Sequence, residues 1–208
     1  MMIKKEILLD AEYGDTKAQL KVGSAYVEHQ DFDKAFYWLN KAAQQDDAEA
    51  QDKILQLAVK GMGKIIDEAI DDEQFDYWYY KREAEKGDVK AQYNLGEAYQ
   101  LGQGVSQDIK IACHWFRKAA ESGHTEAQFS LGLIYELEND GKQAALCFKE
   151  AAKNNHAAAQ VHLAMLYISG VGVLKSMKDA AYWLKLAHAN DNSKAKDLWN
   201  AYELWNYE

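Results

Sequence analysis

The stretch AQYNLGEAYQLGQGV, from Ala91 to Val105, decides the fold of this chain. Its first nine residues follow the pattern Ala-Gln-x-x-Leu-Gly-x-x-Tyr, which returns almost unchanged as AQFSLGLIY further along the chain. The spacing of these copies, 32 to 41 residues, is typical of repeated helical hairpins. Complete, weakened or half copies of the pattern begin at Ala18, Ala50, Ala91, Ala127, Ala159 and Ala195.

A second pattern follows each of the first five copies and predicts the second helix of each hairpin. It places a large residue four or five positions before alanines, so a large side chain and small side chains lie on one face of the helix. Neighbouring helices can then interlock closely. The five versions are WLNKAA at Trp38–Ala43, YYKREA at Tyr79–Ala84, WFRKAA at Trp115–Ala120, CFKEAA at Cys147–Ala152 and WLKLAH at Trp183–His188.

Glycines recur at fixed places in the repeat. Gly23, Gly96 and Gly132 share one register inside the first helix, although glycine costs about 1 kcal/mol relative to alanine there. We expect a steric need, with two helices touching backbone to backbone. The Gly-x-Gly-Val turns at 102–105 and 170–173 follow a helix and recur, so they indicate chain reversals rather than a phosphate-binding loop.

Composition narrows the classes of function. The 208 residues include 48% apolar residues and no proline, which suits an all-helical protein with a substantial core. The net charge of −9 argues against nucleic acid and against an anionic membrane surface as partner, and leaves a basic protein partner open. No apolar run is long enough to span a membrane, so we expect a cytoplasmic protein, or a periplasmic or secreted one if a leader was removed.

No constellation of residues predicts an enzyme. The six histidines lack metal-ligand spacing, and no serine stands in a Gly-x-Ser-x-Gly turn. Cys113 and His114 are adjacent, so they point to different sides of a helix. Cys113 and Cys147 are expected to be free thiols rather than a disulfide. We therefore expect no catalytic residue, no cofactor and no metal site.

The residues from Ala84 to Ala120 resemble the Sel-one-like repeat, a relative of the tetratricopeptide repeat, almost position by position. The other copies match in shorter or altered form, and the second departs most. The resemblance implies an all-α fold, a right-handed α-solenoid of about five helical hairpins with a C-terminal capping helix. It also implies a scaffold or adaptor for other proteins, and some small bacterial members of that family neutralise a toxin.

The chain is predicted to be one repeat domain over residues 1–208, because no linker rich in glycine, serine or proline divides it. At its end, Trp199, Tyr202 and Trp205 are spaced to share a helical face. A cap packed on the fifth repeat is favoured over an exposed aromatic binding site. The predicted repeats are 11–43, 44–84, 85–120, 121–152 and 153–188, followed by a half-repeat and cap at 189–208.

An acidic run from Gln44 to Asp76 contains ten carboxylates and three lysines, and FDYWYY (Phe75–Tyr80) overlaps its end. The favoured interpretation is a solvated face followed by a core helix. The alternative is an acidic lobe with aromatic anchors that docks a basic partner.

By analogy with related helical repeats, the first helices should line a concave, partner-binding groove. The leading hypothesis is a non-enzymatic adaptor that binds a protein or peptide there, with an immunity protein against a bacterial toxin as the alternative. The pattern leaves the oligomeric state open. The predicted groove residues are Lys17, Leu20, Ser24, Val27, Glu49, Asp52, Gln56, Tyr93, Glu97, Gln100, Phe129, Leu133, Glu136, Val161, Met165 and Ile168. For Phe129 and Val161, packing against neighbouring helices was an equal alternative.

Overall fold

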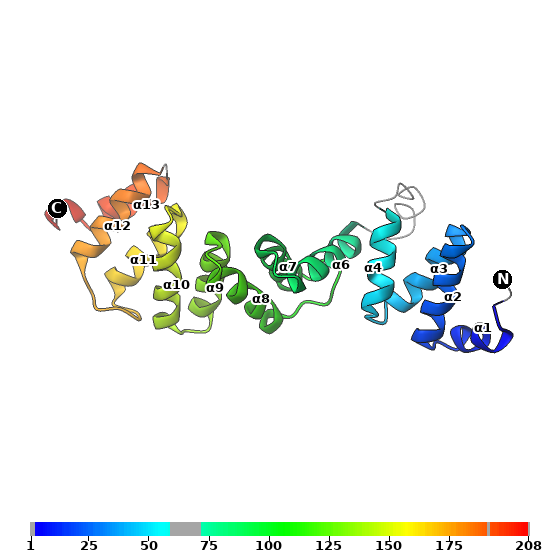
Figure 1. Ribbon diagram of the computed structural model, residues 1–208. Coiled ribbons are helices and arrows are strands. Elements are labelled where there is room, and N and C mark those ends of the chain that lie inside the picture. Colours follow the sequence, from blue (N-terminus) through cyan, green and yellow to red (C-terminus); the bar gives the residue numbers. More distant parts are fainter. Residues whose placement is uncertain (1–2, 59–71, 191, 208) are drawn as a thin grey trace. The chain divides into compact units, whose positions relative to one another are not determined.

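The computed structural model describes residues 3–58, 72–190 and 192–207, and every regular element in these ranges is a helix (Figure 1). The predicted all-α class is confirmed there. Contacts group the chain into two compact units, Met1–Lys86 with Leu101–Gln107 and Gly87–Gln100 with Asp108–Glu208. We call them the N-terminal and C-terminal units and describe each by itself. A single continuous domain stays a prediction.

The N-terminal unit holds the first two hairpins and a lead-in helix. Helix α1 packs on α2, α2 on α3, α3 on α4, and α4 on α6. The pairs α2/α3 and α4/α6 carry the first two copies of the repeat, as the pattern predicted. The bounds are α1 Lys5–Glu12, α2 Thr16–Glu28, α3 Phe32–Ala43, α4 Ala48–Leu57 and α6 Asp72–Glu85.

The C-terminal unit continues the alternation of first and second helices. The Ala-Gln pattern lies on α7, α9 and α11, and the alanine-rich pattern lies on α8, α10 and α12. Each helix from α8 to α12 packs on the next. The bounds are α7 Val89–Leu101, α8 Ile109–Glu121, α9 Thr125–Leu137, α10 Gly141–Lys153, α11 Ala157–Ser169, α12 Met177–Ala189, α13 Ser193–Ala201 and the 3₁₀ helix η2 Leu204–Tyr207.

One short junction recurs at the starts of α2, α4, α7, α9 and α11. A residue with positive φ ends the turn, and the following side chain caps the new helix by accepting the N–H of the repeat alanine at 2.6 to 3.2 Å. Every first helix therefore starts at the same place in the repeat. The positive-φ residues and their capping neighbours are Gly14–Asp15, Asp46–Asp47, Gly87–Asp88, Gly123–His124 and Asn155–His156.

The glycines inside the first helices make room for a large side chain of the second helix. A β-carbon at position 132 would lie 2.6 Å from a ring carbon of Phe148. Gly96 stands in the same relation to Phe116, also at 2.6 Å. Both rings are fully buried. The steric need is thus real at these positions, but an aromatic ring fills the space, and the prediction of backbone touching backbone was wrong there.

Two other hairpins use an aliphatic side chain at this contact. A β-carbon on Gly23 would meet the side chain of Leu39 at 2.7 Å and its backbone nitrogen at 3.0 Å. In the last hairpin, alanine replaces the glycine, and Ala164 shares a fully buried cluster with Leu184. A small residue, glycine or alanine, therefore faces a large side chain in these four hairpins, phenylalanine in two of them and leucine in the other two.

The glutamine of each Ala-Gln pair is buried, and in four of the five pairs it joins consecutive helices. Its amide donates to the carbonyl of an alanine eight residues earlier, near the end of the preceding second helix. That carbonyl also accepts a backbone N–H from the turn that follows, at 2.9 to 3.2 Å, so the glutamine supplies its second hydrogen bond. The bonds are Gln19 to Ala11 (3.0 Å), Gln51 to Ala43 (3.1 Å), Gln128 to Ala120 (3.2 Å) and Gln160 to Ala152 (3.1 Å).

The glutamine oxygen also receives a hydrogen bond in several repeats. Asn190, which follows α12, donates to Gln160 at 3.2 Å, and Asn154 donates to Gln128 at 3.4 Å. Gln45 donates to Gln19 in the N-terminal unit at 2.8 Å. One amide side chain thus connects three successive helices of the stack.

The recurring Gly-x-Gly turns end first helices, as predicted. Gly170 is the left-handed C-cap of α11 with φ of 77°, and Gly172 has φ of 71°. The second glycine has a further role, because its backbone lies directly on that of Gly141 at the start of α10. Gly104 lies in the same way on the backbone of Glu73 in α6. The related GMG at 61–63 lies outside the described residues.

The C-terminal cap is confirmed in part. Ala195 and Leu204 are fully buried against the last hairpin, and Trp199 packs on the same cluster. Tyr202 and Trp205, expected to share this packed face, are instead 44% and 50% exposed. The helix ends at Ala201 and the chain turns through a residue with positive φ before η2, so the helical spacing of three does not continue.

Both cysteines are free and partly buried, which confirms the predicted absence of a disulfide. Burial raises the pKa of Cys147 to about 11 and also raises the pKa of Cys113. Both thiols are therefore protonated at neutral pH, which disfavours nucleophilic chemistry.

Candidate protein-binding surface

The accessible sides of α7, α9 and α11 form the candidate site of the C-terminal unit. Their side chains there are apolar, acidic and imidazole groups, all partly or well exposed. We call this surface the first-helix face. It consists of Tyr93, Glu97, Phe129, Leu133, Glu136, His162 and Met165.

Aromatic rings on this face rest on the caps of the following helix. Tyr93 stacks on His124, with ring centroids 4.6 Å apart and an interplanar angle of 19°. Phe129 lies over His156 with centroids 4.4 Å apart. Each aromatic residue therefore covers the imidazole that caps the next first helix, which fixes successive first helices against each other.

Acidic side chains form hydrogen bonds with the imidazoles on and beside this face. The Nδ1 of His156 accepts the N–H of Ala159, so its proton sits on Nε2 and is donated to Glu126 at 3.0 Å. The imidazole of His162 contacts Glu136 at 3.1 Å. These pairs orient carboxylates and imidazoles along the edges of the apolar strip.

Tyr93 carries the phenol of this face. Its hydroxyl donates to Glu97 at 2.7 Å. Burial, followed by the hydrogen bond to Glu97, raises the pKa of Tyr93 well above its ordinary value. The phenol is therefore a neutral hydrogen-bond donor at any physiological pH.

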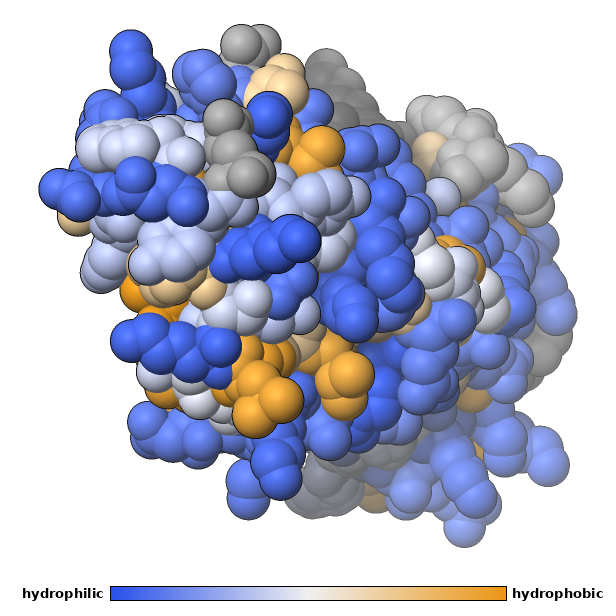
Figure 2. All heavy atoms as spheres, turned by 90° about the vertical axis from the view of Figure 1, so that its left-hand side faces the viewer, coloured by the Kyte–Doolittle hydropathy of each residue, from blue (hydrophilic) through white to orange (hydrophobic). Residues whose placement is uncertain are grey.

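A hollow of about 350 Å³ continues the first-helix face toward the C-terminal helix. The predicted residues Glu136, Met165 and Ile168 line it together with Leu198 and Tyr202. Figure 2 views the side on which the C-terminal helices lie and shows hydrophobic residues gathered among hydrophilic ones. Exposed apolar side chains of this unit include Leu137, Leu146, Val171, Leu174 and Trp205.

Two predicted contact residues of α11 belong to the core. Val161 is 2% exposed and Ile168 is 9% exposed, and both lie in the cluster that contains Ala195 and Leu204 of the terminal segment. For Val161 the burial agrees with the alternative of packing against neighbouring helices. Ile168 is nearly covered by the same cluster but still borders the hollow. Met165, between them in sequence, is 36% exposed, and Gln100 of α7 is half-buried.

In the N-terminal unit, the predicted groove residues follow α2 and α4. Leu20, Ser24 and Val27 are half-buried on α2, while Glu49 and Gln56 are exposed on α4. Leu20, Ser24 and Glu49, together with the exposed Lys17, line one larger hollow of about 730 Å³. That four predicted residues border one hollow supports their common orientation.

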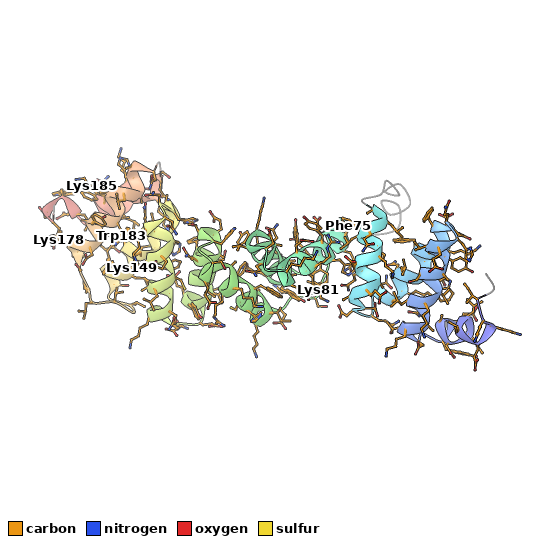
Figure 3. The ribbon with its side chains drawn as sticks, in the orientation of Figure 1. Phe75, Lys81, Lys149, Lys178, Trp183 and Lys185 are labelled. Atoms are coloured by element: carbon orange, nitrogen blue, oxygen red, sulfur yellow. The ribbon has the colours of Figure 1, made fainter. Side chains whose placement is uncertain are left out.

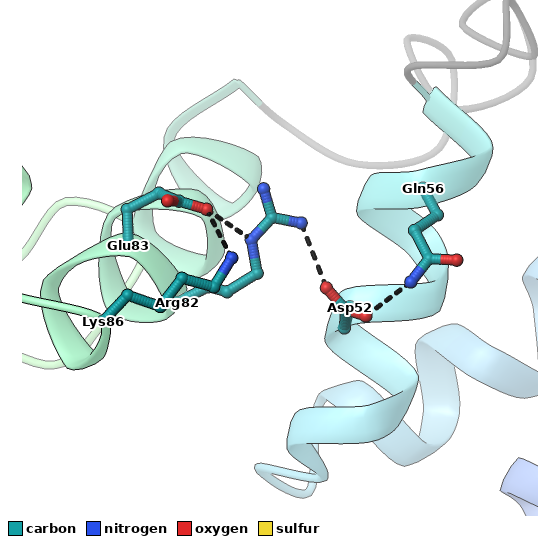
Figure 4. Close-up of polar contacts among 5 residues, drawn as sticks. All are labelled: Asp52, Gln56, Arg82, Glu83 and Lys86. Atoms are coloured by element: carbon teal, nitrogen blue, oxygen red, sulfur yellow. Dashed lines mark hydrogen bonds and ion pairs between the residues drawn. The ribbon is translucent and has the colours of Figure 1, made fainter. Parts of the chain in front are cut away.

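Asp52, the remaining predicted residue, is engaged within its own unit. It accepts hydrogen bonds from Arg82 of α6 at 3.1 Å and from Gln56 at 2.5 Å (Figure 4). Arg82 also contacts Glu83, which in turn receives a bond from Lys86. Asp52 therefore joins α4 to α6, and a partner would compete with Arg82 for its carboxylate.

The described part of the acidic run is partly neutralised by the chain itself. Asp46 pairs with Lys81 at 3.1 Å, Glu49 pairs with Lys53 at 3.4 Å, and Asp47 caps α4. Asp67, Glu68 and Asp71 lie outside the described residues. A basic partner for this run stays a prediction.

The aromatic residues after the acidic run mostly belong to the core. Tyr77 is 4% and Trp78 2% exposed, so the suggestion that they act as docking anchors was wrong for these two. Tyr79 is 43% exposed. Figure 3 marks Phe75 and Lys81 on the same helix, α6. The helix buries one side and presents the other, which agrees with the favoured interpretation of a core helix.

Comparison with known families identifies the repeat. The sequence model of the Sel1 repeat matches residues 16–47, 89–124, 125–156 and 157–192. The chain belongs to the Sel1 repeat family. The unmatched stretch, 48–88, coincides with the most divergent copy. No curated protein matches this Sel1 repeat protein.

Solved structures with the same fold are known. One is a protective antigen present in uropathogenic Escherichia coli strains displaying an SLR fold, 28% identical over 91% of this chain with a TM-score of 0.56. The chain spans only 41% of that protein's length. Another is a Sel1 repeat protein from Oxalobacter formigenes, 34% identical over 61% of this chain and 98% of the other, also with a TM-score of 0.56.

Sel1 repeats generally mediate protein–protein interactions, and the proteins that contain them are generally non-catalytic scaffolds. The described residues contain no group of three or more side chains suited to a metal ion. None of the described helices combines the length and the apolar character that crossing a bilayer requires.

Two structural roles of side chains in the Sel1 repeats were not predicted from the sequence. The first is the hydrogen bond by which the buried glutamine joins two helices. The second is the capping of α9 by His124 and of α11 by His156. Both roles could have been predicted from the repeat. The glutamine recurs at one position, and the two histidines align with the capping aspartates Asp15, Asp47 and Asp88 of other copies. A capping imidazole must keep Nδ1 unprotonated to accept the backbone N–H, and at His124 burial lowers the pKa.

Replacing His124 by asparagine should make stability less dependent on pH. Burial lowers the pKa of His124, while Glu126 and Glu97 oppose this and Lys90 assists it. Because the folded pKa is below the unfolded value, the contribution is complete above about pH 6.5 and is lost as pH falls through the folded pKa. Asparagine caps without titrating.

The measurement is the free energy of urea unfolding at pH 7.5 and pH 5. The wild type should lose more stability than the His124→Asn variant between these values. The control is His114→Asn, which removes an exposed imidazole that caps no described helix. An equal loss in wild type and His124→Asn would contradict the capping role.

Proposed function

We propose that this Sel1 repeat protein is a non-enzymatic scaffold that binds a segment of a partner protein on its first-helix face. The observation that carries the proposal is the exposure of Met165 beside a hollow lined by Leu198 and Tyr202. An accessible apolar side chain next to a concave site is what a partner's anchor residue requires.

The chemistry of the face suggests the kind of segment. Phe129, Leu133 and Met165 offer apolar contacts, while Glu97 and Glu136 add carboxylates. A helical or extended segment with apolar anchors and flanking basic residues would complement both. We therefore expect the bound segment of the partner to carry both basic and apolar residues.

A charge placed at the centre of the face should remove partner binding. Met165→Glu should weaken capture of the partner by at least about tenfold, because a carboxylate in an apolar contact loses its solvation without gaining a partner. The fold should be unaffected, since the side chain is 36% exposed and substitutions at such sites change stability by about 0.5 kcal/mol or less. The measurement is quantitative recovery from native lysate on immobilised protein.

The matched control is Leu146→Glu. Leu146 is 57% exposed on α10, a second helix of the same unit. The control should recover the partner as well as wild type does. Equal recovery of the same partner by Met165→Glu would remove the first-helix face from the proposal.

The alternative of an immunity protein stays a prediction, since the described contacts fit any protein partner. A toxin-like reading frame beside the gene, and rescue from that toxin by this protein, would support it. Absence of such a neighbour would count against it.

A further inference from the structure

The hollow beside Met165 lies where several helices end. We call it the terminal hollow, and its lining includes Glu136, Met165, Ile168, Leu198 and Tyr202. Glu136 is the next-to-last residue of α9, Ile168 is the next-to-last residue of α11, and Tyr202 is the C-cap of α13. The carboxyl ends of three helices therefore border one hollow within the C-terminal unit.

The backbone makes these helix ends electrostatically negative. Aligned peptide dipoles give the carboxyl end of a helix a partial negative charge, which attracts cations over the last turn. Gly141, the first residue of α10, also borders the hollow, but the carboxylate of Asp140 caps that helix start. The partial charges of α9, α11 and α13 therefore act together, because the repeat brings the same end of each helix to the hollow.

One ionised side chain adds to the charge of the helix ends. Among the described residues that line the terminal hollow, Glu136 is the single charged one, and none is a lysine or an arginine. The side chain of Glu136 is 37% exposed, so a ligand can reach its carboxylate. The lining charge and the helix ends thus have the same sign, and both favour a cationic ligand.

The imidazole of His162 orients this carboxylate. Its Nδ1 lies 3.1 Å from Oε2 of Glu136, and since a carboxylate only accepts, Nδ1 carries the proton. Two aromatic rings contact the imidazole in turn, with ring centroids 5.0 Å away for Phe148 and 5.7 Å away for Phe129. His162 therefore holds Glu136 through one oxygen, and the other oxygen can accept from a ligand.

The size and the walls of the hollow favour arginine as the cation. Its volume of about 350 Å³ equals roughly ten liquid waters of about 30 Å³ each, which suits one long side chain. Ile168 and Leu198 supply apolar walls for a methylene stem, and the ring of Tyr202 is 44% exposed. A guanidinium is planar and weakly hydrated, so it stacks on an aromatic ring while donating to a carboxylate, whereas the ammonium of lysine is strongly hydrated.

We propose that the terminal hollow binds an arginine side chain of the partner protein, with the guanidinium on Glu136 and the methylene stem against Met165 and Leu198. This inference rests on the proposed function and names the residue by which the bound segment is recognised. Glu136 then contacts the partner directly, and His162 is a positioning residue.

The test compares three blocked tripeptides, acetyl-Leu-Arg-Leu-amide and its versions with lysine or citrulline in place of arginine. Citrulline has nearly the shape of arginine but no charge. The arginine peptide should bind the full chain at least about fivefold more tightly than either of the others. An NMR titration of isotope-labelled protein measures the affinities, and the largest changes in amide shift should fall on Asn139, Ser169 and Val171, which line the hollow.

Two variants assign the roles of the side chains. Glu136→Gln keeps the shape and removes the charge, so it should bind the arginine peptide no more tightly than the citrulline peptide. Its control is Glu150→Gln, which removes an exposed carboxylate of α10 and should bind as wild type does. His162→Phe keeps a ring but loses the hydrogen bond to Glu136, so it should bind the arginine peptide about threefold more weakly. Its affinity for the citrulline peptide should not change, which a general loss of packing would not produce.

Four outcomes would overturn the inference: no binding of the arginine peptide, equal binding of the citrulline or lysine peptide, shift changes away from the terminal hollow, or full affinity in Glu136→Gln. The peptides test the hollow without the partner, so the two proposals can fail separately. Loss of partner capture in Met165→Glu together with peptides that bind alike would leave the proposed function standing and remove the arginine site. Discrimination among the peptides together with normal capture by Met165→Glu would do the reverse.

Discussion

Replacing Gln160 by leucine should lower the free energy of unfolding by about 2–3 kcal/mol. The side chain is fully buried, and its amide pairs with the carbonyl of Ala152 while its oxygen accepts from Asn190. Leucine has a similar volume but no polar group. The side-chain amide of Asn190 then loses its buried acceptor, and the carbonyl of Ala152 keeps only the N–H of Asn155 at 3.1 Å. Each lost hydrogen bond costs about 1 kcal/mol, and a buried polar group left unpaired costs roughly 1–3 kcal/mol.

Urea unfolding followed by circular dichroism measures this loss. The control is Gln143→Leu, an exposed glutamine in the first turn of α10, for which a change of about 0.5 kcal/mol or less is expected. Equal stability of Gln160→Leu and wild type would mean that the glutamine does not connect the helices energetically.

Replacing Gly132 by alanine should also destabilise the protein, by about 1–3 kcal/mol, although alanine favours a helix. The new methyl group would lie 2.6 Å from the ring of Phe148, which is fully buried and cannot move away freely. The overpacking therefore outweighs the gain of about 1 kcal/mol in helix propensity.

The last hairpin suggests how to rescue this variant. Its notch holds Ala164 with Leu184, so Phe148→Leu should restore part of the stability lost in Gly132→Ala. A double-mutant cycle should show a favourable coupling of about 1 kcal/mol or more. Simple additivity of the two changes would show that the notch and the ring are not in contact in solution.

Much of the fold follows from the sequence because its signals are local and repeated. Four copies carry their own cap, their own small residue and their own bulky partner, so these aligned copies reinforce one assignment. The glycine turn at Gly170–Gly172 was predictable because positive φ is a property of the residue itself. Its contact with Gly141 was not, because that depends on a neighbouring hairpin.

The candidate site was predictable only in outline. The register placed Met165 and Leu133 on the accessible side of the first helices. The same register placed Val161 and Ile168 there, although the terminal segment helps to bury them. Position in a repeat gives the direction of a side chain, but the identity of the covering neighbour changes from one repeat to the next.

The sequence by itself determined the all-helical class and the repeated hairpins, because these depend on caps, small residues and helical periodicity within about 34 residues. Only the tertiary structure decided which residues remain exposed. It closed one side of α11 with the terminal segment, buried Tyr77 and Trp78, and left Met165 accessible beside a hollow. Exposure depends on contacts between distant segments, and a repeating local pattern does not encode which segment packs on which copy.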